Sequence, residues 1–84
     1  MQANNWMPYP KYKPIKNGDY LVTRQITPTR KVVDIKGWTD NLHKMDPDEF
    51  YRNKQHPGWY EYDSEWGFYE VTDIIGWRIM PDPM

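Results

Sequence analysis

The chain has 84 residues, of which fourteen are aromatic (five Trp, seven Tyr and two Phe), eight are proline and none is cysteine. This density of rings argues against intrinsic disorder, and the lack of cysteine excludes a disulfide scaffold and a cysteine-ligated zinc site. The net charge of −1 divides into a basic part, residues 1–45, with eight Lys or Arg against three acids (+5), and an acidic part, residues 46–84, with three against nine (−6).

The first predicted element is a proline-rich arm, residues 1–16, with Trp6 as its anchor in the core. Proline lacks a backbone donor and disfavours helix at the residue before it, so we expect the arm to be extended and packed on a sheet. The arm also holds a stretch in which aromatic and basic residues alternate: Tyr9, Lys11, Tyr12, Lys13 and Lys16.

Two strands are predicted next, after the turn signal Asn17-Gly18. Residues 19–26 and 30–36 are rich in β-branched and aromatic side chains, and a short segment containing Pro28 separates them. This pattern favours an antiparallel hairpin, with a continuation of the second strand through Gly37-Trp38 after a bend.

A short helix is predicted over residues 47–54. Asp46 has the side chain of a helix N-cap, Pro47 suits the first helical position, and Glu49 completes the spacing of a capping box. Pro57-Gly58 prevents the helix from continuing.

The last third of the chain again favours strands, at residues 59–62, 67–71 and 73–80, with 67–80 as one bent strand as an alternative. In an unbroken strand Ile75, Trp77 and Ile79 would share one face, which predicts a core position for Trp77.

These elements predict a single domain, residues 1–84, of the α+β class and mainly β. We expect a small antiparallel sheet or partly open barrel of four to five strands with one short helix. The start of the chain lacks the basic and apolar regions of a signal peptide, and the sequence has no run of about 20 apolar residues, so the cytoplasm is the expected location and no membrane partner is expected.

Both ends of the predicted domain carry short motifs: Trp6-Met7-Pro8, Pro14 and Asn17-Gly18-Asp19-Tyr20-Leu21-Val22-Thr23 near the start, and Ile74-Ile75-Gly76-Trp77-Arg78-Ile79-Met80-Pro81-Asp82-Pro83 at the close. In these segments the chain resembles a family of short phage and prophage proteins of unknown function. Members of that family open with a W-x-P element and finish on I-x-x-W-x-x-x-P-x-P. The resemblance implies a small accessory protein acting in an infected or lysogenic host cell, and it supplies no catalytic residue.

Residue patterns for catalysis are weak. Ser64 is the only serine and has no plausible base beside it, and the glycines are scattered singly rather than gathered in a phosphate-binding loop. His43 and His56 bracket three acids, but the predicted helix start already explains those acids. A glycosidase would need a pair of carboxylates that act as acid and base or nucleophile. The acids of the last third include Glu61, Asp63, Glu65 and Glu70, but nothing in their spacing selects such a pair, and an acidic hairpin loop explains them. We therefore predict no enzyme, no metal site and no cofactor.

Six rings occupy residues 58–69, more than one buried face of a small sheet requires. Either they pair across strands and stabilise the sheet, or one set, Tyr60 with Tyr62 or Trp59 with Trp66, forms an exposed platform for a ligand. The candidate binding residues are Trp59, Tyr60, Tyr62, Trp66 and Tyr69. The neighbouring acids favour a protein partner, particularly a basic one, over nucleic acid.

The sequence thus predicts a non-catalytic, phage-encoded accessory protein that binds a host or phage protein and counters host defence. The alternative is a module for single-stranded nucleic acid or nucleotides, which would use the aromatic platform with Lys11, Lys13 and Lys16. Exposed rings on an edge strand would also permit a homodimer.

Overall fold

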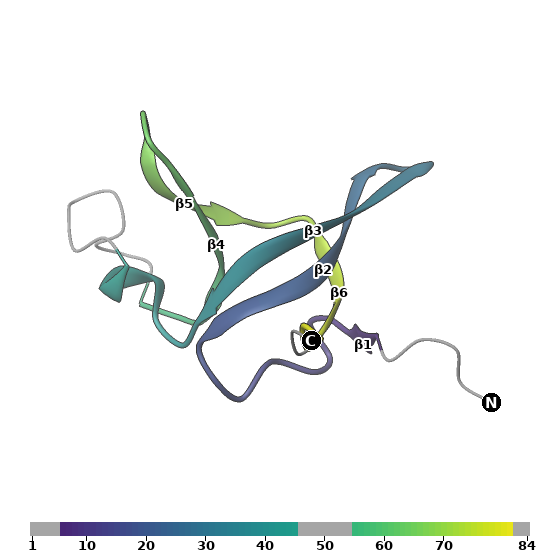
Figure 1. Ribbon diagram of the computed structural model, residues 1–84, viewed down its shortest axis with the longest axis horizontal. Helices are drawn as coiled ribbons and strands as arrows, with labels where there is room; N and C mark the ends of the chain where they lie inside the picture. Colours follow the sequence, from purple (N-terminus) through teal and green to yellow (C-terminus); the bar gives the residue numbers. More distant parts are fainter. Residues whose placement is uncertain (1–5, 46–54, 82–84) are drawn as a thin grey trace.

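The aromatic and β-branched residues form one antiparallel sheet in the part of the chain that the structure, a computed structural model, describes: residues 6–45 and 55–81 (Figure 1). The strand order across the sheet is β1-β6-β2-β3-β4-β5. The strands are β1 (Met7–Pro8), β2 (Gly18–Thr27), β3 (Arg30–Thr39), β4 (Gly58–Asp63), β5 (Gly67–Val71) and β6 (Ile74–Arg78).

The mainly β, antiparallel character predicted from the sequence is confirmed, and residues 6–45 and 55–81 contain six strands in place of four to five. Residues 67–80 form two strands and not one, because Thr72 and Asp73 leave β5 and lead into β6 at a distant position in the sheet. The predicted helix, residues 47–54, falls outside the described residues. Before it lies a short 3-10 helix, η1 (Leu42–Lys44), whose N-cap Asn41 accepts a hydrogen bond from the backbone N–H of His43 at 2.9 Å.

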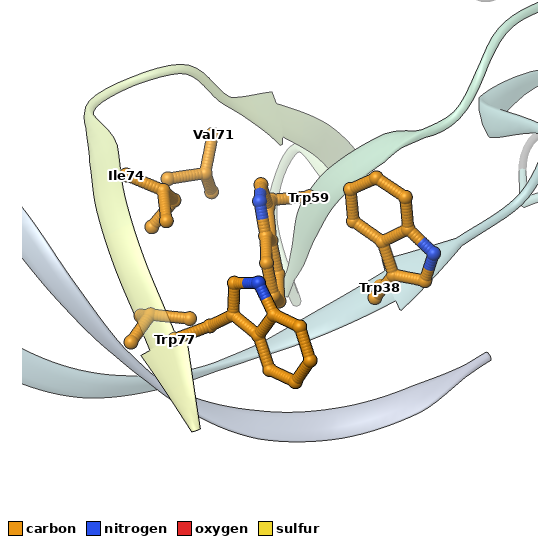
Figure 2. Close-up of a cluster of buried hydrophobic side chains, with 6 residues drawn as sticks. Trp38, Trp59, Val71, Ile74 and Trp77 are labelled. Atoms are coloured by element: carbon orange, nitrogen blue, oxygen red, sulfur yellow. The ribbon is translucent and has the colours of Figure 1, made fainter. Parts of the chain in front are cut away.

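The hydrophobic core covers one face of the sheet, here called the core face. It consists of Val22, Trp38, Trp59, Val71, Ile74 and Trp77. Figure 2 shows the indole rings of Trp38, Trp59 and Trp77 gathered beside Val71 and Ile74. Trp59 and Trp38 are cross-strand neighbours in register, and their rings meet edge to face with centroids 5.0 Å apart.

The strap, residues 9–17, supplies the second layer over this core. Its Tyr9 ring packs edge to face on Trp38 and Trp59, with centroids 5.9 and 5.7 Å apart. Hydrogen bonds fix both ends of the strap: the backbone N–H of Tyr9 donates to the Ile75 carbonyl, and the Tyr20 hydroxyl donates to the Lys16 carbonyl. A third bond, from the indole Nε1 of Trp77 to the Tyr12 carbonyl at 3.0 Å, holds its middle.

The prediction that Ile75, Trp77 and Ile79 share a core face is wrong. Trp77 is in the core, but its core neighbour is Ile74, whereas Ile75 and Ile79 are exposed. The reason is a register shift: Thr23 pairs with Gly76 and Arg24 with Ile74, so Ile75 has no partner on β2. The additional residue of such a bulge reverses the alternation of faces along the strand.

Gly37 is required at its position on β3 because the Tyr60 ring lies across it. A Cβ atom added to Gly37 would overlap the ring and come within 2.7 Å of both its Cε1 and its hydroxyl oxygen. Gly37 and Tyr60 are direct cross-strand partners on the face opposite the core, here called the outer face. The ring therefore covers backbone that a glycine leaves uncovered, as aromatic residues do in other sheets.

We predict that Gly37→Ala lowers the free energy of unfolding by about 1–3 kcal/mol, the usual cost of overpacking. The matched control is Gly76→Ala, because its added Cβ would make only an ordinary contact, 3.4 Å from the Met7 carbonyl oxygen. In a Tyr60→Ala background the cost of Gly37→Ala should vanish, since the obstructing ring is gone. Urea unfolding of the wild type, Gly37→Ala, Tyr60→Ala and the double variant measures this coupling, and an equal cost of Gly37→Ala in both backgrounds would contradict it.

Candidate protein-binding surface

The β4–β5 hairpin divides its rings between the two faces of the sheet. The register places Trp59 and Glu61 on the core face, and Tyr60 and Tyr62 on the outer face. Trp59 is only 1% exposed and is in edge contact with three other rings, so its side chain serves the core. Of the predicted binding residues, Trp59 is therefore the one that a partner cannot reach.

On the outer face the hairpin presents a small cluster of rings. Phe68 on β5 lies between Tyr60 and Tyr62 on β4, with ring centroids 5.7 and 5.0 Å away. Tyr62 is 58% exposed, whereas Tyr60 is half-buried over Gly37. Burial, and then the negative charge of Asp19, raise the pKa of the Tyr60 hydroxyl.

Trp66 is the most exposed ring of the hairpin, at 83%. It lies in the turn between β4 and β5, and the Asp63 carboxylate fixes that turn by accepting the backbone N–H groups of Glu65 (2.7 Å) and Trp66 (3.0 Å). Gly67 follows with φ 82°, a conformation that favours glycine. The hairpin thus holds a large apolar side chain in solvent on an ordered turn.

Tyr69, the remaining predicted binding residue, is exposed but belongs to the core face, where it pairs with Glu61 across the hairpin. It lies apart from the outer-face rings. The structure accordingly brings Tyr60 and Tyr62 together, adds Phe68 to them, and places Trp66 at the turn. Phe68 is one of the six rings counted in residues 58–69 but was not among the candidate binding residues, although its position opposite Tyr62 follows once the hairpin register is known.

Two further outer-face residues, Val33 and Ile35 on β3, are exposed apolar side chains that the sequence did not single out. Their alternation with Val32 and Asp34 was visible, but it did not show which set faces the core. Because Asp34 pairs with Val22 in the sheet, Asp34 belongs to the core face and the apolar pair belongs to the outer face.

The core face also carries a chain of ion pairs beyond its apolar cluster. Arg24 binds Asp73 through two hydrogen bonds (2.8 and 2.9 Å) and Asp34 through one (3.3 Å). The buried ammonium of Lys36 contacts both Asp34 (3.0 Å) and Glu61 (3.3 Å). These five charges are thus used within the sheet.

The ion pairs change the acidity of their members. The hydrogen bonds from Arg24 outweigh burial and lower the pKa of Asp73. Burial works to raise the pKa of Asp34, but hydrogen bonds from Lys36, the Ile35 backbone and Arg24 outweigh it and lower that pKa. Burial opposes the charge of Lys36, yet its two carboxylate partners raise its pKa. All three groups are therefore charged at neutral pH.

The predicted basic strip lies on the strap, on the other side of the molecule from the hairpin turn (Figure 1). Lys11, Lys13 and Lys16 are exposed, and the Lys13 ammonium donates to the Pro10 carbonyl at 3.1 Å. Tyr9 is packed in the core, which leaves Tyr12 as the exposed ring of the strap.

The described residues contain no group of three His, Asp or Glu side chains placed to hold a metal ion. His43 lies in η1 and His56 just before β4, while the three acids between them fall outside the described ranges. No helix in residues 6–45 or 55–81 is long and apolar enough to cross a membrane. Comparison with protein-family models, with characterised proteins and with solved structures gives no match.

We predict that alanine substitutions at two tryptophans of the hairpin region change the free energy of unfolding by very different amounts. Trp59→Ala should lower the free energy of unfolding by about 3–5 kcal/mol, because it removes the centre of the core. Trp66→Ala should change it by less than about 0.5 kcal/mol, because the ring is in solvent. Thermal and urea unfolding monitored by circular dichroism measure both values, and comparable losses would disprove the assignment of Trp66 to the surface.

A further prediction concerns acid stability. The pKa of Asp73 is lower in the folded protein than in the unfolded chain, so its contribution is complete above the unfolded value of about 3.9 and is lost as the pH falls through the folded value. Asp73→Asn should therefore destabilise the protein more near neutral pH than at about pH 2. In an Arg24→Gln background this pH dependence should shrink; an unchanged dependence would mean that another partner lowers the pKa.

Proposed function

We propose that this protein acts without catalysis, by binding another protein through the β4–β5 hairpin. The observation that carries the proposal is the exposure of Trp66 on a turn that Asp63 holds in place. Tryptophan and tyrosine are enriched among the residues that dominate binding energy at protein interfaces. An ordered turn also loses little conformational entropy when it binds.

The charge around the rings supports a basic partner. Residues 58–71 contain Glu61, Asp63, Glu65 and Glu70 and no Lys or Arg. Glu61 pairs with Lys36, but Asp63 and Glu65 lie on the same turn as Trp66. Such a potential attracts a positively charged surface and repels phosphate, so it raises the rate of encounter with a basic protein.

Resemblance to short phage proteins supports the further proposal that the partner is a host or phage protein in the cytoplasm, bound to counter host defence. This part rests on the motifs that include Trp6 and Trp77. Both motif tryptophans have structural contacts: Trp77 is buried in the core, and the Trp6 ring lies 5.8 Å from the Arg78 guanidinium. The motifs therefore support common ancestry of the fold rather than a common binding site.

Single-stranded nucleic acid is the second candidate ligand, and one observation favours it. Tyr12 is exposed on the strap with the Lys11 ammonium 5.5 Å from its ring centre, and Lys13 and Lys16 are nearby in the chain. One ring is a small platform, since binding modules of this kind stack several bases. Protein binding through the hairpin is therefore the preferred proposal.

The test is affinity capture from host lysate by the immobilised protein and by Trp66→Ala/Tyr62→Ala, followed by titration of the purified captured protein. We expect the double variant to bind at least about 30-fold more weakly, the effect of losing one dominant residue. The matched control is Ile26→Ala/Lys31→Ala, which removes two exposed side chains from the β2–β3 hairpin.

Equal loss in the control, or equal capture by all three proteins, would contradict a hairpin site. Titration with labelled oligonucleotides separates the two candidate functions. Tight binding that weakens steeply with salt, and that Lys11→Gln/Lys13→Gln reduces while Trp66→Ala does not, would favour nucleic acid.

A further inference from the structure

An apolar cavity of about 310 Å³ lies between the strap and β6. It is lined by Ile15, Lys16, Tyr20, Trp77 and Ile79. Ile15 is fully exposed and Ile79 is 71% exposed, although both are large aliphatic side chains. Solvent-exposed apolar side chains that gather at a concave site are typical of an interaction surface.

The positive charge at this cavity comes from Lys16, which lines it. The strap also carries Lys11 and Lys13, and it has no acid between residues 9 and 16. Arg78, the neighbour of Ile79, lines a second cavity of about 340 Å³ that shares the Trp77 and Ile79 side chains. An occupant that fits here combines a large apolar or aromatic group with negative charge.

The β4–β5 turn of this same chain has that chemistry. It offers the exposed Trp66 ring, with Glu65 and Asp63 in the same turn. Indole is the aromatic group that cations bind best, so Lys16 at the cavity suits it as well as the apolar walls do. Figure 1 shows the turn at the top of the molecule and the strap at the bottom, so the two cannot meet within one copy.

We propose that the cavity between the strap and β6 receives the Trp66 turn of a second copy of this chain. This inference rests on the proposed role of the hairpin in protein binding and names its partner. The two surfaces are different, so the contact is head to tail, and a pair of copies keeps one free turn on one copy and one free cavity on the other. Contacts of this kind continue into open chains unless they close into a ring.

Sedimentation velocity of the whole protein at increasing concentration tests the proposal. At low salt we expect the mean sedimentation coefficient to rise steadily with protein concentration. Added salt should lower this coefficient, because it screens the attraction between the basic cavity and the acidic turn to a range of a few ångströms. Trp66→Ala disables the turn, and Ile15→Glu/Lys16→Glu disables the cavity at exposed positions; each should weaken association at least about 30-fold. The matched control, Ile26→Glu/Lys31→Glu on the β2–β3 hairpin, should associate like the wild type.

The decisive measurement mixes the two disabled proteins. Trp66→Ala retains an intact cavity and Ile15→Glu/Lys16→Glu retains an intact turn, so together they should form a one-to-one dimer and nothing larger. A mixture that stays monomeric, or association that neither variant changes, would overturn the head-to-tail contact. If the wild type is monomeric at every concentration while the hairpin still captures a different protein, this inference fails and the proposed function stands; if nothing is captured either, both fail.

Discussion

The packing of Trp59 against rings from three elements is the contact on which the rest of the structure depends. Its ring packs edge to face on the rings of Tyr9 in the strap, Tyr20 on β2 and Trp38 on β3, with ring centroids 5.7, 6.0 and 5.0 Å away. The core face of a sheet needs a layer opposite it to exclude water, and the strap supplies this opposite wall. Trp59 joins that wall to the two central strands, and the hydrogen bond from Trp77 to the strap secures the same arrangement on β6.

Once Trp59 faces the core, the positions of the other hairpin rings follow. Side chains alternate along a strand, so Tyr60 and Tyr62 must lie on the outer face, and a slip of one residue would exchange the two sets. The Tyr60 ring recovers some burial by covering Gly37, whereas Tyr62 and Trp66 remain in solvent. The exposed aromatic surface is therefore a consequence of how the core is made, and it persists because the register is fixed from the buried side.

Alternation along the chain was sufficient to predict the hairpin of β2 and β3 and the strands of the last third, and it placed Trp77 in the core but with the wrong neighbours. It was insufficient where both faces of a strand carry rings, because the sequence alone does not show whether Trp59 or Tyr60 faces the core. It also failed at Ile75, since a bulge depends on the pairing with β2, which lies about 50 residues away. The candidate site was predicted as a set of rings, and only the register separated Trp59 from the rest.

The separation of charge along the sequence has a physical outcome in the fold. Arg24 and Lys36 offset two of the three charges on their partners Asp34, Asp73 and Glu61, which leaves a net charge of only −1 on the core face, so the network contributes little to the electrostatic potential outside the sheet. The lysines of the strap and the acids of the β4–β5 turn lie outside this network, at the bottom and the top end of the molecule as drawn in Figure 1. At ordinary ionic strength the screening length is about 8–10 Å, so each end acts on a partner almost independently of the other. A molecule with two independent, oppositely charged apolar ends is suited to contacts made end to end, and the direction of such contacts is set by the same sheet that buries Trp59.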